Sequence, residues 1–401
     1  MMSEWKDVEI LGNYIDVING YAFKSSNFHN SKKENLMPVL KIKNVANGDV
    51  HLLGVQYHAY NESLKKYIVS KGDVLIALTG NHPQAMTQVV GDASRYRLDE
   101  SALLNQRVAK VMPKDSIQND YLYYFLKDDA THDYLASQSS GSANQANISK
   151  KDIENIRIQL PTFTKQKSIA NILGSLDDKI DLLHRQNVTL EAMAETLFRQ
   201  WFVVEAKESW EIVKIGDVLQ TVLGGTPSTE KPEYWNGTIP WINSGEVNNF
   251  RIFKGSKFIT ELGLKKSNAK LLPLGTTVLA ITGATLGQVS LLEIETCANQ
   301  SVVGIIPNEK WPKEFVFLWI KLKIKEIILN ETGGAQGHIN KNDINETDIL
   351  KPGEKCMVEY TKLLRPIFEK ITKNSYQIEL LTKLRDTLLP KLMSGEVKAN
   401  F

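Results

Sequence analysis

Apolar residues repeat every seven positions in two long segments of the chain. The first segment carries two interleaved series, Ile169, Leu176, Leu183, Leu190 and Leu197, and Leu173, Ile180, Asn187, Ala194 and Trp201. The second carries Tyr360, Ile367, Asn374, Leu381 and Leu388, and Leu364, Ile371, Ile378, Arg385 and Leu392. A two-seam heptad of this extent predicts coiled-coil helices. About 35–40 helical residues would span roughly 50–60 Å.

Three seam positions are polar: Asn187, Asn374 and Arg385. They either fix the register of the helices at a cost in stability, or turn toward solvent. The sequence favours neither of these two interpretations over the other. Pro366 either begins the second long helix or kinks it, because a proline inside a helix removes a hydrogen bond.

The remaining segments show the alternation of short strands and helices. β-rich runs interrupted by glycine and polar turns predict strands at 39–45, 74–79 and 107–111, and again at 278–282, 288–292 and 301–306. One amphipathic helix is expected in each half, near 120–137 and 313–329. The order is therefore globular domain, long helix, globular domain, long helix.

The two halves also share short sequences in the same order. WKDVEILGNYIDVINGYAF from Trp5 corresponds to WEIVKIGDVLQTVLGGTPS from Trp210, and GDVLIALTG (72–80) to GTTVLAITG (275–283). Asn-Gln occurs at 105–106 and 299–300, YLYYFLK (121–127) matches FVFLWIK (315–321), and GSANQANISKKDI (141–153) matches GGAQGHINKNDI (333–344). Ordered repetition of this kind indicates an internal duplication.

We therefore predict an α+β fold in which two similar mixed α/β domains are separated by two long antiparallel coiled-coil helices, with an internal pseudo-two-fold repeat. The expected divisions are 1–158, 159–205, 206–352 and 353–401. Two domains held apart in this way would read two separated targets, and half-sites one turn of B-DNA apart (roughly 34–36 Å) face the same side.

Charge does not by itself indicate a nucleic-acid partner. The 401 residues hold 48 Lys and Arg against 46 Asp and Glu, a formal net charge of +2. A DNA-binding surface would have to come from the placement of basic groups. Two cysteines, Cys297 and Cys356, without zinc-ligand spacing make a disulfide framework or zinc site unexpected. With no signal peptide and no apolar run long enough for a membrane span, we expect a soluble, cytoplasmic protein.

Sequence motifs of catalysis are missing from the chain. It contains no GxxxxGK[ST] phosphate loop, no Asn-Pro-Pro tetrapeptide of the kind that amino-methyltransferases use, and no HExxH or GxSxG. We therefore expect no catalytic residue, no metal site and no cofactor of its own. An enzyme with an unrecognised site, such as a single-chain nuclease–methylase, is the less favoured alternative.

Two segments resemble one known family. LPTFTKQKSIANILGSLDDKIDLLHRQNVTLEAMAETLFRQWF (160–202) is similar to the central conserved region of type I restriction–modification specificity subunits, and LRDTLLPKLMSGEV (384–397) to their distal conserved region. The openings at Trp5 and Trp210 look like the starts of target recognition domains. The chain departs from the family at 162–165, where Pro-Pro-Leu and an acidic residue are usual.

The resemblance implies a non-catalytic, DNA-binding subunit of a restriction system that acts in phage defence. Each recognition domain would bind one half of a bipartite asymmetric site in double-stranded DNA, and the helices would set the spacer. Two methyltransferase subunits would carry S-adenosylmethionine, and restriction–translocase subunits would join them for cleavage. The alternative is a two-domain coiled-coil scaffold that binds proteins and not DNA, which the weak basicity keeps open.

Base reading requires side chains that present paired donors and acceptors to the DNA grooves. The candidates in the first half are Thr79, Asn81, His82, Gln84, Gln88, Arg95, Arg97, Asn105, Arg107, Asn144, Gln145 and Lys150. Those in the second half are Thr282, Thr285, Gln288, Asn299, Gln336, His338 and Lys341. The helix-seam residues expected to hold the helices or a partner are Leu176, Leu183, Leu190, Leu197, Trp201, Ile371, Ile378, Leu381 and Leu388.

Residues shared by both copies are less suited to reading two different half-sites. For the repeated Asn-Gln pair we therefore favour a role in the scaffold or in phosphate contact. Unrepeated residues such as His82, Gln84, Arg95 and Arg97 are better candidates for specificity. The tryptophans Trp201, Trp210 and Trp319 are expected in the core or at an interface, where a large ring with one polar group is favoured.

Overall fold

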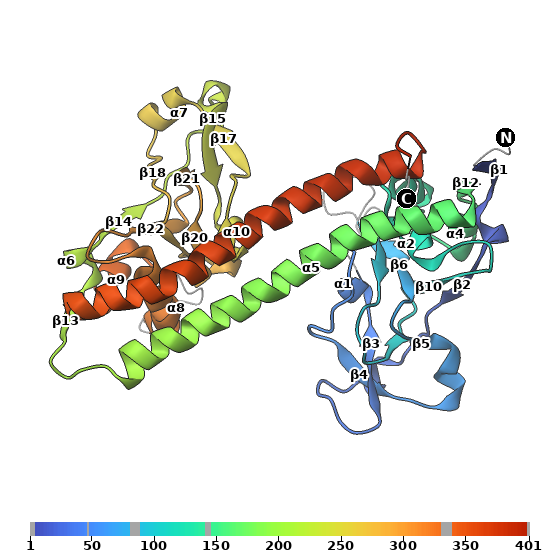
Figure 1. Cartoon of the computed structure of the whole chain (residues 1–401), viewed down its shortest axis with the longest axis horizontal. Coiled ribbons are helices and arrows are strands. Elements are labelled where there is room, and N and C mark those ends of the chain that lie inside the picture. Colours follow the sequence, from blue (N-terminus) through green and yellow to red (C-terminus); the bar gives the residue numbers. More distant parts are fainter. Residues whose placement is uncertain (1–4, 46–47, 81–88, 141–145, 330–338, 399–401) are drawn as a thin grey trace. The chain divides into compact units, whose positions relative to one another are not determined.

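The computed structural model describes residues 5–45, 48–80, 89–140, 146–329 and 339–398. The chain divides into two compact units. Unit 1 comprises Met1–Lys179 and Leu381–Phe401, and unit 2 comprises Ile180–Leu380. Each unit contains a globular part, which we call domain 1 or domain 2, and segments of both long helices (Figure 1). The two units are described separately.

Domain 1 is built on two four-stranded sheets. The first has the order β2 (Ile15–Asn19), β10 (Val108–Pro113), β6 (Val74–Ala77) and β8 (Ala93–Arg95). The second has the order β4 (Gln56–Ala59), β3 (Leu36–Leu40), β9 (Ala102–Leu104) and β5 (Ile68–Val69). Two further pairs are β1 (Trp5–Ile10) with β12 (Arg157–Pro161), and β7 (Thr79–Gly80) with β11 (Ala146–Asn147). The buried β6 and β9 consist of apolar residues, as expected for strands covered on both faces.

Short helices complete domain 1. They are α1 (Ile42–Val45), α2 (Asn119–Lys127), α3 (Asp129–Gln138) and α4 (Lys150–Glu154). The main core joins the first sheet, α2 and the long helices, because Tyr121 and Tyr124 pack in one cluster with Ile169, Leu173 and Leu389. Domain 1 is therefore anchored on both long helices within unit 1.

Domain 2 repeats this plan. Its five-stranded sheet has the order β14 (Gln220–Leu223), β22 (Val302–Ile306), β19 (Thr277–Ala280), β20 (Val289–Leu292) and β16 (Arg251–Ile252). Its four-stranded sheet has the order β17 (Lys257–Ile259), β15 (Trp235–Ile242), β21 (Thr296–Ala298) and β18 (Leu271–Leu272), and β13 (Glu211–Lys214) pairs with β23 (Asp348–Lys351). The helices are α6 (Ile215–Val218), α7 (Glu261–Lys266), α8 (Lys313–Leu329) and α9 (Lys341–Asn345).

The core of unit 2 is aromatic where domain 2 meets the long helices. Phe198, Phe202, Phe315, Trp319 and Tyr360 pack with ring centroids 4.6–6.4 Å apart in the contacting pairs. Aromatic pairs at this separation add to the stabilisation that burial provides. The indole Nε1 of Trp319 also donates a 2.9 Å hydrogen bond to the Asp348 carbonyl, so this tryptophan is part of the core.

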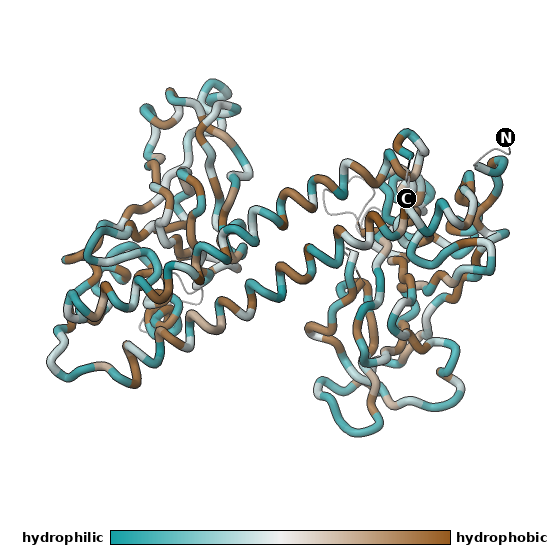
Figure 2. Tube along the Cα trace, in the orientation of Figure 1, coloured by the Kyte–Doolittle hydropathy of each residue, from teal (hydrophilic) through white to brown (hydrophobic). Residues whose placement is uncertain are grey.

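The two long helices are α5 (Phe163–Arg199) and α10 (Glu354–Met393). They run antiparallel in each unit. In unit 1, Leu173 shares a core cluster with Leu389 and Asp177 pairs with Arg385; in unit 2, Asn187 contacts Asn374 and Phe198 contacts Tyr360. Hydrophobic colour recurs at intervals along both helices in Figure 2, as a single apolar seam requires. The predicted mixed α/β fold with two long antiparallel helices is confirmed.

Two of the three polar seam residues, Asn187 and Asn374, lie inside the helix pair, whereas Arg385 is partly exposed and pairs with Asp177 and Asp386. Asn187 is 7% exposed and Asn374 is 0% exposed. Asn374 Nδ2 donates to Asn187 Oδ1 at 3.0 Å, and Asn187 Nδ2 donates to Ser375 Oγ at 3.1 Å. Of the two interpretations left open by the sequence, this geometry favours the one in which the amides fix the register.

Two local predictions were wrong, and one of the two alternatives for Pro366 is excluded. The expected strand at 39–45 stops at Leu40, because Asn44 accepts a hydrogen bond from the Lys41 amide and closes a helical turn, α1. The expected helix at 120–137 is broken at Asp128, whose extended backbone (ψ 135°) ends α2 and precedes α3. Pro366 does not begin the second long helix but lies within α10, and the alternative that it kinks the helix stays a prediction. Pro366 and Lys362 are both exposed, and the Lys362 carbonyl lacks the amide donor that another residue at 366 would supply.

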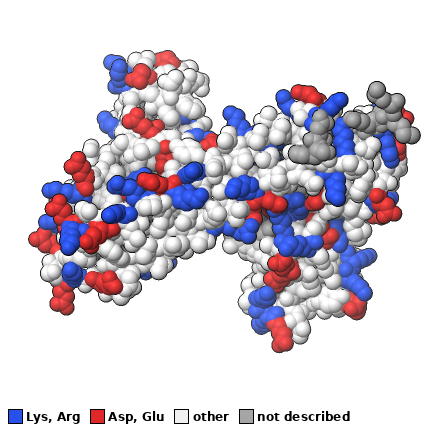
Figure 3. Space-filling view, in the orientation of Figure 1, with Lys and Arg blue, Asp and Glu red and all other residues white. Residues whose placement is uncertain are grey.

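Basic and acidic side chains are interleaved on the face drawn in Figure 3. A mixed surface of this kind agrees with the small net charge. Within the described ranges, no helix combines the length and the apolar character that a membrane span requires.

Candidate nucleic-acid interface

Three separate segments of domain 1 meet at one edge. The Leu78 amide donates to the Arg107 carbonyl at 2.9 Å, and the Ile148 amide donates to the Leu78 carbonyl at 2.9 Å. The Thr79 hydroxyl donates to Asn147 Oδ1 at 2.7 Å. We call residues 78–80, 105–107 and 146–150 the loop-stem edge of domain 1, because two of the predicted reading loops start and end there.

Domain 2 has the same edge. The Ile281 amide donates to the Ser301 carbonyl and the Ile339 amide to the Ile281 carbonyl, both at 2.9 Å. Residues 281–285, 299–301 and 339–341 form the loop-stem edge of domain 2. The backbone hydrogen bonds are therefore repeated in both copies, although the side chains differ.

The repeated asparagines occupy tight turns against glycine. A Cβ placed on Gly20 would lie 2.1 Å from the Asn105 carbonyl oxygen, and one on Gly224 would lie 2.2 Å from that of Asn299. Side chains do not tolerate such a distance to backbone, so both glycines are required for the close approach. Asn299 Oδ1 also accepts from the Ser301 amide at 3.1 Å. This geometry supports a scaffold role for the repeated pair.

The motifs SKKD and NKND at the edge are helix starts. Ser149 and Asp152 form a capping box at the start of α4, and Asn340 and Asp343 form one at the start of α9. Such reciprocal bonds satisfy amides that a helix leaves unpaired at its first turn. The next residues in the chain, Lys150 and Lys341, are exposed. Lys150 Nζ lies 3.4 Å from Glu154 Oε1.

The other described candidates at or beside the edges differ in exposure. Arg107 and Gln288 are exposed, whereas Thr282 and Thr285 are half-buried and Thr79 is buried. The Thr285 hydroxyl donates to the Thr282 carbonyl at 3.4 Å. Eight further candidates lie outside the described residues: Asn81, His82, Gln84, Gln88, Asn144, Gln145, Gln336 and His338.

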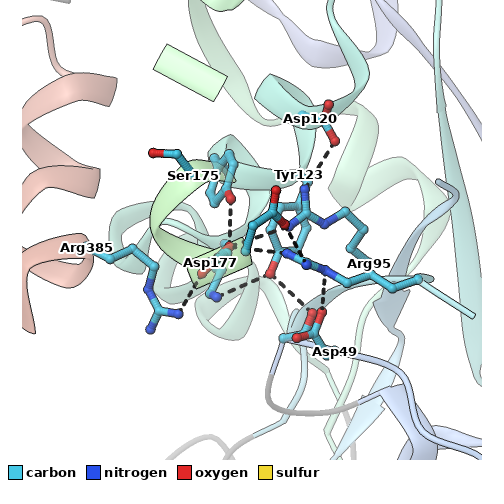
Figure 4. Close-up of polar contacts among 12 residues, drawn as sticks. Asp49, Arg95, Asp120, Tyr123, Ser175, Asp177 and Arg385 are labelled. Carbon is cyan, nitrogen blue, oxygen red and sulfur yellow. Dashed lines mark hydrogen bonds and ion pairs between the residues drawn. The ribbon is translucent and has the colours of Figure 1, made fainter. Parts of the chain in front are cut away.

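Arg95 and Arg97 lie away from the loop-stem edge, against α5. Arg95 Nη1 is 3.2 Å from Asp120, and Arg95 Nη2 is 3.5 Å from Asp177 (Figure 4). Arg97 is 2.9 Å from Asp178 and 3.3 Å from Asp49. Base reading by either guanidinium would require these ion pairs to break. Sequence reasoning selected them as unrepeated arginines but had no means of locating their carboxylate partners.

Asp177 is the most buried carboxylate of this group, at 8% side-chain exposure. Burial opposes its ionisation, but Lys127, the Tyr124 hydroxyl and Arg385 outweigh burial and hold the pKa of Asp177 below its ordinary value. Tyr124 donates to Asp177 at 2.6 Å, and Arg385 Nη1 donates at 2.9 Å. Asp177 is therefore a buried anion that joins domain 1 to α5 and α10.

The helix-seam candidates pack between the long helices within each unit. Leu183 and Ile371 are buried, and the others are partly buried: Leu176, Leu190, Leu197, Trp201, Ile378, Leu381 and Leu388. The Trp201 and Tyr360 rings lie 5.8 Å apart. These positions contribute to helix pairing, and their role toward a partner subunit stays a prediction.

Sequence reasoning missed a basic pocket in domain 2. Its lining brings together three lysines with hydroxyl and amide side chains: Thr226, Ser228, Lys231, Tyr234, Lys265, Lys266, Ser267 and Asn268. The Thr226 hydroxyl donates to Gln300 Oε1, so the pocket adjoins the loop-stem edge. The only signal in the sequence is the pair Lys265-Lys266, and Lys231 is too distant in the chain to be joined to it without the fold.

Comparison with known proteins agrees with this architecture. The model of the type I restriction modification DNA specificity domain matches residues 2–192 and 207–380. The chain is 28% identical over 316 residues to the type I restriction enzyme MjaIX specificity subunit of Methanocaldococcus jannaschii, covering 73% of this chain and 72% of that one. It is 23% identical over 411 residues to the HindI specificity subunit of Haemophilus influenzae, covering 83% and 88%.

One solved structure has the same fold. The S subunit of a type I restriction-modification system from M. genitalium superposes with a TM-score of 0.61 at 16% identity, covering 97% of this chain and 96% of that one. The duplicated domains and paired helices thus have the fold of that structure. The chain belongs to the type I restriction–modification DNA specificity family. Its role is target recognition, and it is a non-catalytic subunit.

Proposed function

We propose that each globular domain reads one half of a bipartite, asymmetric DNA site through its loop-stem edge. The predicted divisions, 1–158 and 206–352 for recognition and 159–205 and 353–401 for the helices, would then separate reading from spacing. The long helices would set the length of the unspecified spacer. The observation that carries the proposal is the repeated edge: identical backbone hydrogen bonds hold different exposed side chains in the two domains.

The exposed side chains of the two loop-stem edges differ from each other, as recognition of two different half-sites would require. Arg107 lies at the edge of domain 1, where domain 2 has the smaller Ser301. Arginine is the side chain best suited to bidentate contact with guanine in the major groove. We therefore assign Arg107 to base contact in the first half-site.

The basic pocket of domain 2 supports a sequence-independent contribution. Lys231, Lys265 and Lys266 surround hydroxyl groups of Thr226 and Ser228. Lysine and hydroxyl side chains contact phosphate oxygens and position a protein on the duplex without reading bases. We assign this pocket to the DNA backbone next to the second half-site.

Partner subunits complete the proposed complex. Two methyltransferase subunits, which bind S-adenosylmethionine, would dock on the two related halves, and restriction–translocase subunits would join them for cleavage. The complex would act on DNA in the cytoplasm. The specificity subunit itself needs no cofactor for recognition.

Deletion of the gene in the host tests the proposal most directly. We expect one bipartite adenine-methylation pattern to disappear from the methylome. Replacement of Arg107 by alanine should then cost about 1–3 kcal/mol at one position of one half-site. Arg157→Ala, at an exposed arginine on β12, is the matched control and should change nothing.

Two outcomes would contradict the proposal. An unchanged methylome in a strain that expresses the whole complex would exclude target recognition of this kind. DNA retention that is absent, or that does not depend on salt with the methyltransferase present, would favour a protein-binding scaffold, because phosphate contacts release counterions and weaken as salt rises.

A further inference from the structure

Unit 1 holds a buried charged junction between domain 1 and the two long helices. Asp177 on α5 faces Arg385 on α10 at 2.9 Å, Arg95 at 3.5 Å and Arg97 at 3.9 Å (Figure 4). Arg95 also stacks over Tyr123, with 4.8 Å from its guanidinium carbon to the ring centroid. One buried carboxylate thus contacts basic groups from the domain and from the opposite helix.

Unit 2 has a corresponding junction between domain 2 and the long helices, in which the charges of the ion pair are exchanged. Arg251 Nε lies 3.6 Å from Glu293, and both side chains are almost fully buried, at 1% and 4% exposure. Arg251 stacks on Phe317 at 4.7 Å and on Phe368 of α10 at 4.9 Å. Glu293 Oε1 accepts a 2.8 Å hydrogen bond from the Thr372 hydroxyl on α10.

The pairing of strands establishes which residues correspond. Ser94 pairs with Leu75 in domain 1, and Ser290 pairs with Val278 in domain 2, so Arg97 occupies the position of Glu293. Asp49 forms a parallel bridge to Arg95, as Arg251 does to Leu291.

The pair Asp49–Arg97 is therefore the pair Arg251–Glu293 with its charges reversed. KKDI (150–153) and KNDI (341–344) are 191 residues apart, and the heptad series that begin at Ile169 on α5 and Tyr360 on α10 keep the same offset, which makes Asp177 the counterpart of Phe368. The residue on the long helix differs with the direction of the ion pair. The carboxylate of Asp177 faces Arg97 in unit 1, and the ring of Phe368 faces Arg251 in unit 2.

We propose that Asp177 and Phe368 are positioning residues, each of which fixes the orientation of its recognition domain on its own segment of the long helices. The exchanged charges make the two junctions mutually incompatible, and we call this selective fit of a domain to its helix segment keying. Arg97→Glu would replace a basic partner of the buried Asp177 with a second carboxylate, and like charges in a poorly solvated site repel each other. The domain would then leave its native orientation. This inference rests on the proposed function, because orientation on the helix is what gives a defined spacer.

Three variants of domain 1 test the keying. Asp177→Asn keeps the size of the side chain and an oxygen for the Tyr124 hydroxyl, but removes the charge. The double variant Asp49→Arg with Arg97→Glu reverses the pair while Asp177 stays. The triple variant adds Asp177→Phe and so reproduces the reversed pair and the aromatic ring of unit 2. Arg95, whose counterpart is Leu291, keeps Asp120 at 3.2 Å, and Arg385 keeps Asp386 at 2.7 Å.

The measurement is binding of the complex, with its methyltransferase partner, to duplexes in which both half-sites are fixed and the spacer varies by one or two base pairs. We expect Asp177→Asn and the reversed pair to reduce the preference for the native spacer about tenfold, because a lost buried partner lets the domain adopt other orientations. Half-site sequence preference should be kept. The triple variant should regain spacer preference.

The matched control reverses an exposed ion pair, Glu211→Lys with Lys351→Glu, whose atoms lie 2.6 Å apart on β13 and β23. Exposed pairs contribute little, so we expect native behaviour. Equal loss of affinity at every spacer length would overturn the positioning role and leave Asp177 as a purely stabilising residue. Native spacer preference in the reversed pair, or no recovery in the triple variant, would overturn the keying.

Failure of the proposed function gives a different result. The wild-type complex would then show no spacer-dependent binding to any duplex. Urea unfolding of unit 1 would still decide the keying, since the reversed pair should lower its midpoint and Asp177→Phe should restore it.

Discussion

The buried amide pair in the helix seam gives a test in which one and two substitutions act in opposite directions. We consider Asn187→Leu, Asn374→Leu and the double variant. In the wild type, Asn374 Nδ2 donates to Asn187 Oδ1 at 3.0 Å and to Gln186 Oε1 at 3.3 Å. Gln186 is only half-buried, so water replaces a lost partner there. Asn187 is 7% exposed, so its amide oxygen has no such replacement.

The expected loss of stability comes from the Asn187 amide oxygen, which loses its donor in Asn374→Leu. A buried acceptor without a partner costs about 1–3 kcal/mol, so Asn374→Leu should destabilise unit 2 by about 2 kcal/mol. For a unit of this size the melting temperature would fall by about 4–8 °C. In the double variant both polar groups are replaced by apolar ones, and we expect stability equal to the wild type or above it.

Tryptophan fluorescence in urea reports this change selectively. Apart from Trp5, all tryptophans of the chain lie in unit 2: Trp201, Trp210, Trp235, Trp241, Trp311 and Trp319. With destabilisation counted as positive, the cost of the double variant minus the summed costs of the two single variants should be negative, by about 2 kcal/mol or more. Single variants as stable as the wild type, or a double variant as unstable as the sum of the singles, would refute the reasoning.

Three further predictions concern the turns, a titrating histidine and the helices. Gly20→Ala and Gly224→Ala should each destabilise their unit by about 3 kcal/mol, because the added Cβ overlaps a carbonyl oxygen. Thermal unfolding measures this loss. The control Gly353→Ala, where a Cβ meets open space, should leave the melting temperature unchanged. His132 Nε2 lies 3.2 Å from Asp92 Oδ1, and this carboxylate raises the pKa of the imidazole above its ordinary value of 6.5. The stabilisation from protonated His132 is complete below pH 6.5 and is lost as pH rises through the raised pKa; urea midpoints measured from pH 5.5 to 8.5 should show this fall, and His132→Gln should abolish it. Inserting one heptad within 189–196 and another within 366–373 adds about 10 Å of helix and should change the tolerated DNA spacer but not the half-sites; altered half-site bases in the methylome would count against the spacing role of the helices.

The long helices could be predicted from the sequence because their signal is local and repeats. Every seventh residue from Ile169 to Leu197 is apolar, and no knowledge of distant contacts is needed to interpret that. The ends and interruptions were less predictable. The break at Asp128 depends on one backbone angle, and α10 continues through Pro366 at an exposed position of the helix, which the seven-residue repeat does not specify.

The candidate site was only partly predictable for the opposite reason. The loop stems Thr79, Arg107 and Asn147 meet through hydrogen bonds between segments far apart in the chain, which repetition suggested but did not establish. Arg95 and Arg97 have the residue type that reads DNA, yet their carboxylate partners on α5 lie about eighty positions further along the chain, as the separation of 81 residues between Arg97 and Asp178 shows. Residue type alone does not distinguish an arginine that faces solvent from one that is neutralised internally.

This distinction also explains why net charge was a poor guide to function. Arg95, Arg97 and Arg385 are matched by carboxylates inside unit 1, and Arg251 is matched by Glu293 inside unit 2. These charges enter the total of the chain but contribute little to the field outside it, because each lies beside its counter-charge. The lysines of the basic pocket surround hydroxyl groups and form an exterior surface. A chain with a formal charge of only +2 thus carries local positive charge in domain 2, where we propose that the phosphate backbone binds, while arginines of both units are neutralised at the junctions with the helices.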